Sequence, residues 1–258
     1  MEESNKKQYP FAGQTVMVTR PCGEDDALSK MLGGLGAKVV HQPVICISDP
    51  PDWSPVDSVL DRLAEFDWIV FSSANGVKYF LGRLYAAGGD SGQLRRARLA
   101  AIGPATSDAL LRHGLTADVI PPEFRAEALG ESLSGRASGK RFLLVRASRG
   151  REVLAEQLAA AGGIVEQVVA YTSSDVERPD PEIERMLAAG EVDWITVTSS
   201  SIARALANLF GEKLRQSKLA SISPVTSAAL RELGFEPTAE AEQYTMPGLV
   251  DAICHAMG

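Results

Sequence analysis

The sequence predicts an α/β protein built from two similar parallel-sheet α/β domains, joined by a two-stranded β connector. Internal repetition is the first observation, because residues 16–49 align without a gap to 142–175, and 99–115 align to 219–235. The second is the alternation of strand-like apolar runs with helical periodicity, which is typical of parallel sheets. Two such domains would form a ligand cleft between them, lined by the polar ends of their strands.

The first copy begins with a buried strand over 15–19, where a short apolar run stops at an arginine and a proline. Helical spacing over 25–35 predicts a helix that Gly36 ends. The run 38–47 is rich in β-formers, and a proline-rich breaker follows it. Further along, the same signals predict strand 68–71, helix 75–84, strand 100–102, helix 104–113, strand 117–120 and helix 126–133.

The second copy repeats this order after a polar, glycine-containing connection over 134–140. Its proline at position 224 precedes a helical pattern, where a missing N–H costs no hydrogen bond. The expected elements are strand 142–145, helix 151–161, strand 163–171, strand 194–198, helix 202–210, strand 220–223, helix 225–233, strand 237–241 and helix 246–255.

The matched runs 38–49 and 164–175 each lead away from a β-α unit, and we expect them to pair as the connector. The chain would then start in one domain, cross to the second and cross back. The first domain would hold 1–37 and 176–258, and the second 50–163. Two sequential domains that divide near Lys140 are the alternative. The strand count favours the crossover, because the four strand signals that follow residue 49 complete one sheet.

Bulk composition excludes several classes of protein. The net charge of −7 argues against general nucleic-acid binding, which needs a basic face. No run reaches the roughly 18 apolar residues of a membrane span, and the polar start of the chain lacks a signal core. Three scattered cysteines, at positions 22, 46 and 254, suit reduced thiols, so a cytoplasmic protein is expected. Histidine and cysteine spacing predicts no metal site, and nucleotide-binding motifs are absent, so no cofactor is expected.

Hydroxyl-rich clusters follow a buried strand of each copy and precede a helix. The first holds Ser72, Ser73 and Asn75, and its counterpart holds Thr198, Ser199 and Ser200. Hydroxyls and free backbone N–H groups at the start of a helix can bind an anion. Ordinary helix capping is the competing interpretation, because Ser, Thr and Asn cap helices in every kind of protein.

A second pair of helix starts lies one strand further along each copy. Gly103 and Thr106 belong to the first, and Ser223 and Thr226 to the second. Each can bind a carboxylate through backbone N–H and hydroxyl groups, and capping is again the alternative. Four such sites at four strand ends suit a ligand with several carboxylates.

Two matched arginines and a tyrosine complete the candidate residues. Arg20 and Arg146 end the first strand of each copy, where a cation often serves a ligand, although solvated surface arginines are common. Tyr171 stands at the end of the second connector run. Its hydroxyl could face the cleft as a donor, or its ring could be simple β-sheet filler.

Taken together, the motif order resembles the uroporphyrinogen III synthase family over nearly the whole chain. The matching segments are Val-Thr-Arg-Pro, Phe-Ser-Ser-Ala-Asn-Gly-Val, Ile-Gly-Pro-Ala-Thr, Leu-Leu-Val-Arg, Val-Ala-Tyr-Thr, Thr-Ser-Ser-Ser and Ser-Pro-Val-Thr-Ser. The resemblance implies two α/β domains with a two-stranded link. It also implies a cofactor-free, cyclising lyase of tetrapyrrole and heme biosynthesis, which closes hydroxymethylbilane into uroporphyrinogen III with inversion of the last pyrrole ring.

The resemblance also implies roles for residues. It makes Tyr171 the best candidate for the catalytic proton donor. It carries substrate binding to Arg20, Ser72, Ser73, Asn75, Gly103, Thr106, Thr198, Ser199 and Thr226, and the matched positions in the repeat add Arg146 and Ser200. Ser223 departs from the family, which often has glycine there, and its Cβ is expected to restrict φ and narrow the approach of a carboxylate. The expected substrate is a linear tetrapyrrole with many carboxylates, handed over transiently by hydroxymethylbilane synthase to a monomer that contacts neither nucleic acid nor membrane.

Two other functions compete with this one. A non-catalytic ligand-binding or regulatory protein of the same two-lobed fold is compatible with the Ser223 departure and with the absence of an obvious catalytic group. A two-domain sugar or amino-acid receptor would also bind its ligand between α/β lobes, but such receptors are usually exported. Activity with freshly made hydroxymethylbilane separates the first alternative from the enzyme.

Overall fold

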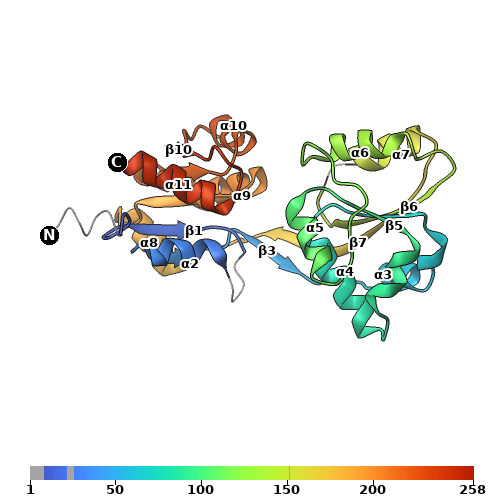
Figure 1. Ribbon diagram of the computed structural model, residues 1–258. Coiled ribbons are helices and arrows are strands. Elements are labelled where there is room, and N and C mark those ends of the chain that lie inside the picture. Colours follow the sequence, from blue (N-terminus) through green and yellow to red (C-terminus); the bar gives the residue numbers. More distant parts are fainter. Residues whose placement is uncertain (1–8, 22–25, 151) are drawn as a thin grey trace. The chain divides into compact units, whose positions relative to one another are not determined.

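The computed structural model describes residues 9–21, 26–150 and 152–258 of the chain. The chain divides into two compact units, the first made of Met1–Cys46 and Ser174–Gly258, the second of Ile47–Ser173. Each unit has its own five-stranded sheet (Figure 1). The predicted fold class of two parallel-sheet α/β domains is confirmed by these sheets.

The first unit is built around a sheet with the strand order β10-β9-β8-β1-β2, in which neighbouring strands run parallel. Its strands are β1 (Thr15–Val18), β2 (Lys38–His41), β8 (Trp194–Val197), β9 (Lys218–Ser221) and β10 (Ala239–Glu240). Its helices are α2 (Ala27–Gly34), α8 (Pro181–Ala188), α9 (Ser200–Phe210), η3 (Gly211–Gln216), α10 (Pro224–Glu232) and α11 (Met246–Met257).

Helices cover both faces of this first sheet. The reason is that the chain passes from strand to strand in opposite directions in the two halves of the sheet. The chain moves one way from β1 to β2 and the other way from β8 through β9 to β10. Right-handed crossovers therefore place α2 on one face and α9 and α10 on the other. The helix α11 joins α2, because Leu249 and Ile253 pack with Leu28 and Leu32 in one buried cluster.

The second unit has the strand order β3-β7-β6-β4-β5. Its strands are β3 (Ile45–Ser48), β4 (Trp68–Phe71), β5 (Arg98–Ala101), β6 (Arg141–Ala147) and β7 (Ile164–Asp175). Its helices are α3 (Ser54–Leu60), η1 (Leu63–Glu65), α4 (Ala74–Ala86), η2 (Ser91–Arg96), α5 (Pro104–Leu111), α6 (Ala126–Ser134) and α7 (Val153–Ala160).

Alternation along the strands of the second sheet creates two separate cores. On β4, Ile69 and Phe71 pack with α3, α4 and α5, whereas Trp68 and Val70 pack with α6 and α7. Figure 1 shows the two helix layers above and below this sheet. The carboxyl ends of the strands thus emerge between helices that begin there, which is where a functional site is expected in such a sheet.

The aspartates of the repeated Asp-Trp pairs, Asp67 and Asp193, make equivalent hydrogen bonds in the two units. Asp67 accepts a hydrogen bond from the backbone N–H of Arg141 (2.9 Å), and Asp193 accepts one from Thr15 (2.7 Å). Each carboxylate therefore ties the start of one strand to the start of its neighbour. The repeat thus preserves a partly buried contact that anchors neighbouring strands at their amino ends in each sheet.

The predicted connector run 38–49 is divided in the structure. Its first part forms β2, which pairs with β1 rather than with 164–175. Pro43 interrupts the run because it has no N–H to donate. After it, β3 lies beside β7 in the second sheet, and Val176 N–H donates to Val44 O (3.0 Å). The expectation that the whole of 38–49 pairs with 164–175 is therefore wrong for its first half.

Other differences concern short elements. The predicted strand 117–120 is reduced to one bridge between Ala100 and Val119, and the predicted strand 237–241 to two residues. The sequence does not predict helices α3 and α8; each is short and has a proline in its first turn, so the periodic signal is weak. Residues 25 and 151, which begin two predicted helices, lie outside the described part of the chain. Among the described residues, no helix combines the length and apolarity that crossing a membrane requires.

Candidate functional site

The candidate residues of the second unit meet at one edge of its sheet. Strands β6, β4 and β5 are parallel neighbours, and Val145 lies opposite Phe71. Arg146 follows on β6 and Ser72 follows on β4, while Gly103 lies just beyond β5. These predicted residues are therefore brought together by the sheet, whereas their role in binding stays a prediction.

Ser72 and Ser73 already have structural hydrogen bonds. Ser73 caps α4, because its Oγ accepts from the backbone N–H of Gly76 (2.9 Å). The Oγ of Ser72 donates to Val145 O (3.2 Å) on the neighbouring strand. Asn75 is half-buried in the first turn of α4. The capping interpretation is thus correct for Ser73, and it does not prevent the remaining lone pair or proton from serving a ligand.

Tyr171 is held near the end of β7 by two aromatic and polar contacts. Its hydroxyl lies 3.0 Å from the Oγ of Ser73. Its ring stacks on Tyr79, with 5.7 Å between centroids and 27° between planes. The residue is only 7% exposed. Burial raises the pKa of the Tyr171 hydroxyl above its ordinary value, and the bond to Ser73 opposes that shift, so the group is a neutral donor near pH 7.

The contact between Ser73 and Tyr171 leaves one proton available. Because Ser73 Oγ accepts the N–H of Gly76, it can donate its own proton to Tyr171 Oη. The phenolic proton of Tyr171 is then directed to another acceptor. In the reverse arrangement, Tyr171 donates to Ser73 and the serine proton is available instead. In both arrangements the pair presents one O–H donor.

Arg146 is held by several groups of its own unit. Its Nη1 contacts the carboxylate of Glu152 and donates to Gln167 Oε1 (2.8 Å). Its Nη2 donates to Gly150 O (3.1 Å), and its Nε to Ala147 O (3.3 Å). The hydrogen bond from Arg146, and secondarily that from Gln167, lowers the pKa of the Glu152 carboxyl. The guanidinium is thus neutralised locally rather than exposed as a bare cation.

A cavity of about 220 Å³ joins these groups. Its polar lining includes Ser72, Arg146, Gln167 and Tyr171, and apolar side chains from β4, β6 and α7 complete it. Arg149 also lines it, so the cavity combines the neutral Tyr171 hydroxyl and two arginine side chains with apolar walls. Such a cavity suits the carboxylate of a larger ligand together with the apolar atoms that carry it.

Gly103 and Thr106 begin α5 at the same sheet edge. Gly103 is extended, with φ −175°, and a Cβ there would approach Phe124 to 3.2 Å. The backbone therefore does not require a glycine here, although a Cβ would need Phe124 to shift slightly. Thr106 is 3% exposed, and its backbone N–H donates to Gly103 O (3.1 Å). Ser107 N–H also donates to Gly103 O (3.0 Å) and Pro104 has no N–H, so Ala105 N–H is the group of this first turn that is left for an anion.

The first unit repeats this arrangement on β1, β8 and β9, which are parallel neighbours. Thr198 follows β8, and Ser199 caps α9 by accepting from Ile202 N–H (3.2 Å). Ser200 Oγ donates to Val225 O (3.3 Å), which ties this helix start to the next one. The two predicted clusters of this unit thus lie together.

The departure at Ser223 has a structural explanation. Ser223 is extended, with φ −165°, a conformation that any residue adopts. Its Oγ caps α10 by accepting from Thr226 N–H (3.4 Å) and lies 3.2 Å from Thr226 Oγ1. The expectation that a Cβ at this position restricts φ is therefore wrong. Thr226 is 2% exposed, so its hydroxyl faces the interior of this loop.

Arg20 occupies the matched edge position of the first unit. Its Nη1 lies 3.9 Å from Asp26 Oδ1, and Asp26 in turn caps α2 by accepting from Ser29 N–H (3.0 Å). About a third of the Arg20 side chain (35%) is exposed. It is thus paired with an acid, as Arg146 is, although by a longer contact.

Comparison with known proteins identifies the family of this chain. The model of the uroporphyrinogen-III synthase family (HemD) matches residues 26–251. The chain belongs to the uroporphyrinogen-III synthase family. A uroporphyrinogen-III synthase from Synechococcus elongatus is 33% identical over 95% of this chain and 96% of its own length. Another, from Chlorobaculum parvum, is 29% identical over 95% of this chain and 99% of its own length.

Solved members of the uroporphyrinogen-III synthase family share the fold. One from Thermus thermophilus matches with a TM-score of 0.67 and 22% identity, over 95% of this chain and 98% of its own. Another, from Helicobacter pylori, matches with a TM-score of 0.62 and 18% identity, over 94% and 98% of the two chains. At these identities the likeness concerns the fold of the family.

Sequence reasoning missed three residues at this family member's candidate site. Glu152 and Gln167 hold Arg146, and Tyr79 supports the Tyr171 ring. Strand alternation could have found Gln167, because Val165 faces α7 and the second residue after it must face the same way. No sequence signal points to Glu152 or Tyr79, since their contacts depend on how helices pack on the sheet.

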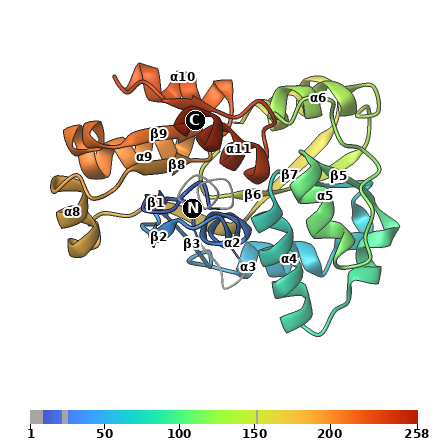
Figure 2. The same cartoon turned by 60° about the vertical axis from the view of Figure 1, so that its left-hand side comes forward.

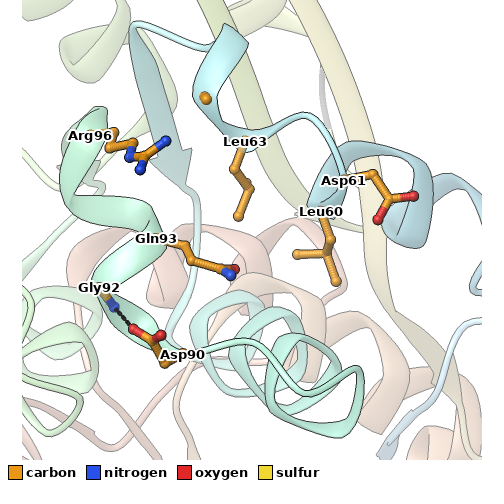
Figure 3. A pocket seen from close by; sticks show the side chains of 8 residues that line it. Leu60, Asp61, Leu63, Asp90, Gly92, Gln93 and Arg96 are labelled. Atoms are coloured by element: carbon orange, nitrogen blue, oxygen red, sulfur yellow. Dashed lines mark hydrogen bonds between the residues drawn. The ribbon is translucent and has the colours of Figure 1, made fainter.

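A larger pocket of about 410 Å³ lies away from these residues. It is lined by side chains next to η1 and η2, which lead into β4 and β5, so it lies by the amino ends of the strands. Figure 3 shows Asp90 turned back to the N–H of Gly92, a bond of 2.7 Å that caps η2. None of the predicted site residues lines this pocket, and of its two acids, Asp61 and Asp90, the second already caps η2.

Proposed function

We propose that this chain is an active uroporphyrinogen-III synthase, which cyclises hydroxymethylbilane to uroporphyrinogen III with inversion of the last ring and loss of water. Membership of the family supports the reaction. The observation that supports catalysis by this chain is the buried Tyr171 hydroxyl, 3.0 Å from Ser73 and in a cavity shared with Arg146.

In this proposal Tyr171 is the catalytic residue. The pyrrole nitrogens of the substrate push out its hydroxyl, which leaves as water when it gains a proton. Tyr171 is uncharged in the free enzyme because burial keeps its pKa high. It hydrogen-bonds the departing hydroxyl and passes its proton to it, and the resulting phenolate regains a proton when ring closure releases one. A positioned proton donor of this kind typically contributes about 100-fold to 10,000-fold in rate. The Ser73 hydroxyl orients the phenol.

The substrate's carboxylates bind, in the same proposal, at the strand ends of both units. Helix starts with unsatisfied backbone N–H groups supply most of each binding site, supported by an arginine at the matched edge position. The residues proposed for binding are Arg20, Ser72, Ser73, Asn75, Gly103, Thr106, Arg146, Thr198, Ser199, Ser200 and Thr226. Several weak sites suit a substrate with many carboxylates, because orientation of the chain decides which carbon attacks.

The decisive experiment measures the isomer ratio of the product made from fresh hydroxymethylbilane. Active enzyme gives type III, whereas ring closure without inversion gives type I. If the purified, folded protein forms no type III product, the chain is a non-catalytic ligand-binding member of the family. Binding of product by such an inactive protein would then identify the alternative function.

We further infer that the enzyme works as a cytoplasmic monomer that receives its substrate from hydroxymethylbilane synthase. The free thiols of Cys46 and Cys254 support a reducing compartment, while Cys22 lies outside the described residues. Sedimentation velocity with and without hydroxymethylbilane synthase tests both statements. A dimer of this chain alone, or no faster transfer of substrate in the mixture, would contradict them.

A further inference from the structure

Arg146 and Gln167 together hold both oxygens of the Glu152 carboxylate. The guanidinium Nη1 contacts Oε1, and the Gln167 amide Nε2 donates to Oε2 (2.7 Å). Gln167 Oε1 in turn accepts from the same Nη1 (2.8 Å). The three side chains form a closed ring in which a guanidinium and an amide enclose one carboxylate. Guanidinium and amide N–H groups are donors with which proteins recognise carboxylates, and here one guanidinium nitrogen and one amide nitrogen share the two oxygens.

The enclosed group has the chemistry of an alkyl carboxylate. A glutamate side chain ends in two methylenes and a carboxylate, so any ligand arm of similar length fits the same ring of donors. Arg146 and Gln167 both line the cavity that also contains Ser72 and Tyr171. An alkyl carboxylate held at Arg146 would therefore lie in the cavity that holds the proposed proton donor.

Glu152 can leave this position at small cost. Half of its side chain (50%) is exposed, whereas only 17% of the Arg146 side chain is. The acid stands directly before α7 and makes no side-chain cap to that helix. Exposed ion pairs stabilise proteins little, because water solvates both partners almost as well. The arginine is thus fixed, and its partner is the replaceable member of the pair.

We propose that Arg146 and Gln167 form a receptor for one alkyl carboxylate of the substrate, and that Glu152 occupies it as an internal ligand until the substrate displaces it. The inference rests on the proposed function for the identity of the substrate. It assigns Glu152 a competing role: the acid keeps the guanidinium neutralised in the free enzyme and weakens carboxylate binding by its own presence.

A positioning role for Glu152 makes the opposite prediction. If the acid mainly orients the guanidinium, removing its charge would loosen Arg146 and weaken carboxylate binding. The two roles are separated by the sign of the change in affinity, so a single conservative substitution decides between them.

The test uses Glu152→Gln, which removes the charge and keeps the size of the side chain. Propionate is titrated into the full-length protein while the NMR signal of the Arg146 Nε–H is followed. Tighter propionate binding by roughly twofold to fivefold is expected, as for the loss of an exposed ion pair. Glu156→Gln is the matched control, because this exposed acid lies one turn along the same helix. It removes the same charge and should change nothing.

Unchanged or weaker propionate binding in Glu152→Gln would overturn the proposal. So would an equal gain in Glu156→Gln, which would reveal only an effect of net charge. With hydroxymethylbilane, Glu152→Gln should lower KM by a similar factor, and Glu156→Gln should leave KM as it is. If the wild-type protein makes no uroporphyrinogen III, the proposed function fails, but the propionate titration still decides the role of Glu152.

Discussion

The hydroxyl of Tyr171 lies 3.0 Å from the Oγ of Ser73, and that Oγ also caps α4. One serine thus links the proposed proton donor to the start of a helix. The start of α4 directly follows β4 and is fixed by the sheet. The hydrogen bond to Ser73 therefore fixes the position of the Tyr171 hydroxyl as well. The relationship leads directly to the first two predictions.

Tyr171→Phe should lower turnover by about 100-fold to 10,000-fold, because the substrate's departing hydroxyl loses its proton donor. The free energy of unfolding should fall by only about 1 kcal/mol, the usual worth of one hydrogen bond. Steady-state kinetics and chemical denaturation measure the two effects. The remaining product should stay type III if binding sets the fold of the substrate chain. Tyr79→Phe is the control. Near-wild-type turnover of Tyr171→Phe would show that the Tyr171 hydroxyl is not the proton donor and that the ring only packs in the sheet.

Ser73→Ala should cost about 1 kcal/mol of stability, because α4 loses its cap. Ser199→Ala should cost a similar amount, since Ser199 caps α9 in the matched position. The two variants should differ in turnover, because only Ser73 contacts Tyr171. Equal losses of activity in both would show that the serine–tyrosine contact does not matter for catalysis.

Single substitutions at the helix starts should be tolerated. Thr226→Ala is expected to reduce kcat/KM only partially, because backbone N–H groups remain and one hydrogen bond to a charged group is worth roughly 1.5–3 kcal/mol. Kinetics on a protein whose fold is checked by circular dichroism give the answer. Complete loss of activity with an intact fold would point to one dominant catalytic group at that loop.

Gly103→Ser copies the serine of the second repeat into the first. The backbone there is extended, so the substitution brings no φ strain. The new Cβ would meet Phe124 at 3.2 Å, but that ring is 60% exposed and has room to move. We expect a change in the free energy of unfolding of less than about 0.5 kcal/mol, as for a surface site. A fall of several kcal/mol in denaturant unfolding would mean that Phe124 cannot yield.

Tyr171 should ionise at a higher pH than a tyrosine of ordinary pKa. Burial raises its pKa above the ordinary value of 10.0, so the folded state binds this proton more tightly than the unfolded state. Its contribution to stability is therefore complete below pH 10 and is lost as pH rises through the folded pKa. Tyrosinate absorbance of the wild type minus that of Tyr171→Phe isolates the titration. A midpoint at or below 10 would contradict the buried, neutral hydroxyl.

Much of this architecture could be predicted from sequence because the repeat and the apolar periodicity are local signals. They placed β1, β4, β6 and β8 and the helices α4, α9 and α11 close to their true bounds. Parallel strands then bring their carboxyl ends to one edge, so Arg146 and Ser72 could be grouped without coordinates. The short helices α3 and α8 were not predicted, because helices of about two turns with a proline in the first turn show little apolar periodicity.

Contacts made across elements could not be predicted in the same way. Glu152 reaches Arg146 only because α7 packs on the face of the sheet from which that arginine emerges. Tyr79 reaches Tyr171 through the packing of α4. The division of the connector run could have been foreseen from Pro43, since a residue without an N–H cannot continue a ladder in both directions. Long-range geometry, rather than local propensity, decided what was missed.

The discontinuity of the first unit has a consequence for biosynthesis. The strand β1 needs the central strand β8 on one side, and Trp194 of β8 is synthesised 178 residues after its β1 partner Val16. The unit Ile47–Ser173 is continuous, so it can fold on the ribosome as soon as it has emerged. Until β8 is synthesised, the apolar side chains of the nascent β1-α2-β2 segment lack the packing partners that they have in the folded unit. A holdase chaperone would therefore meet this protein first at its amino-terminal fifth.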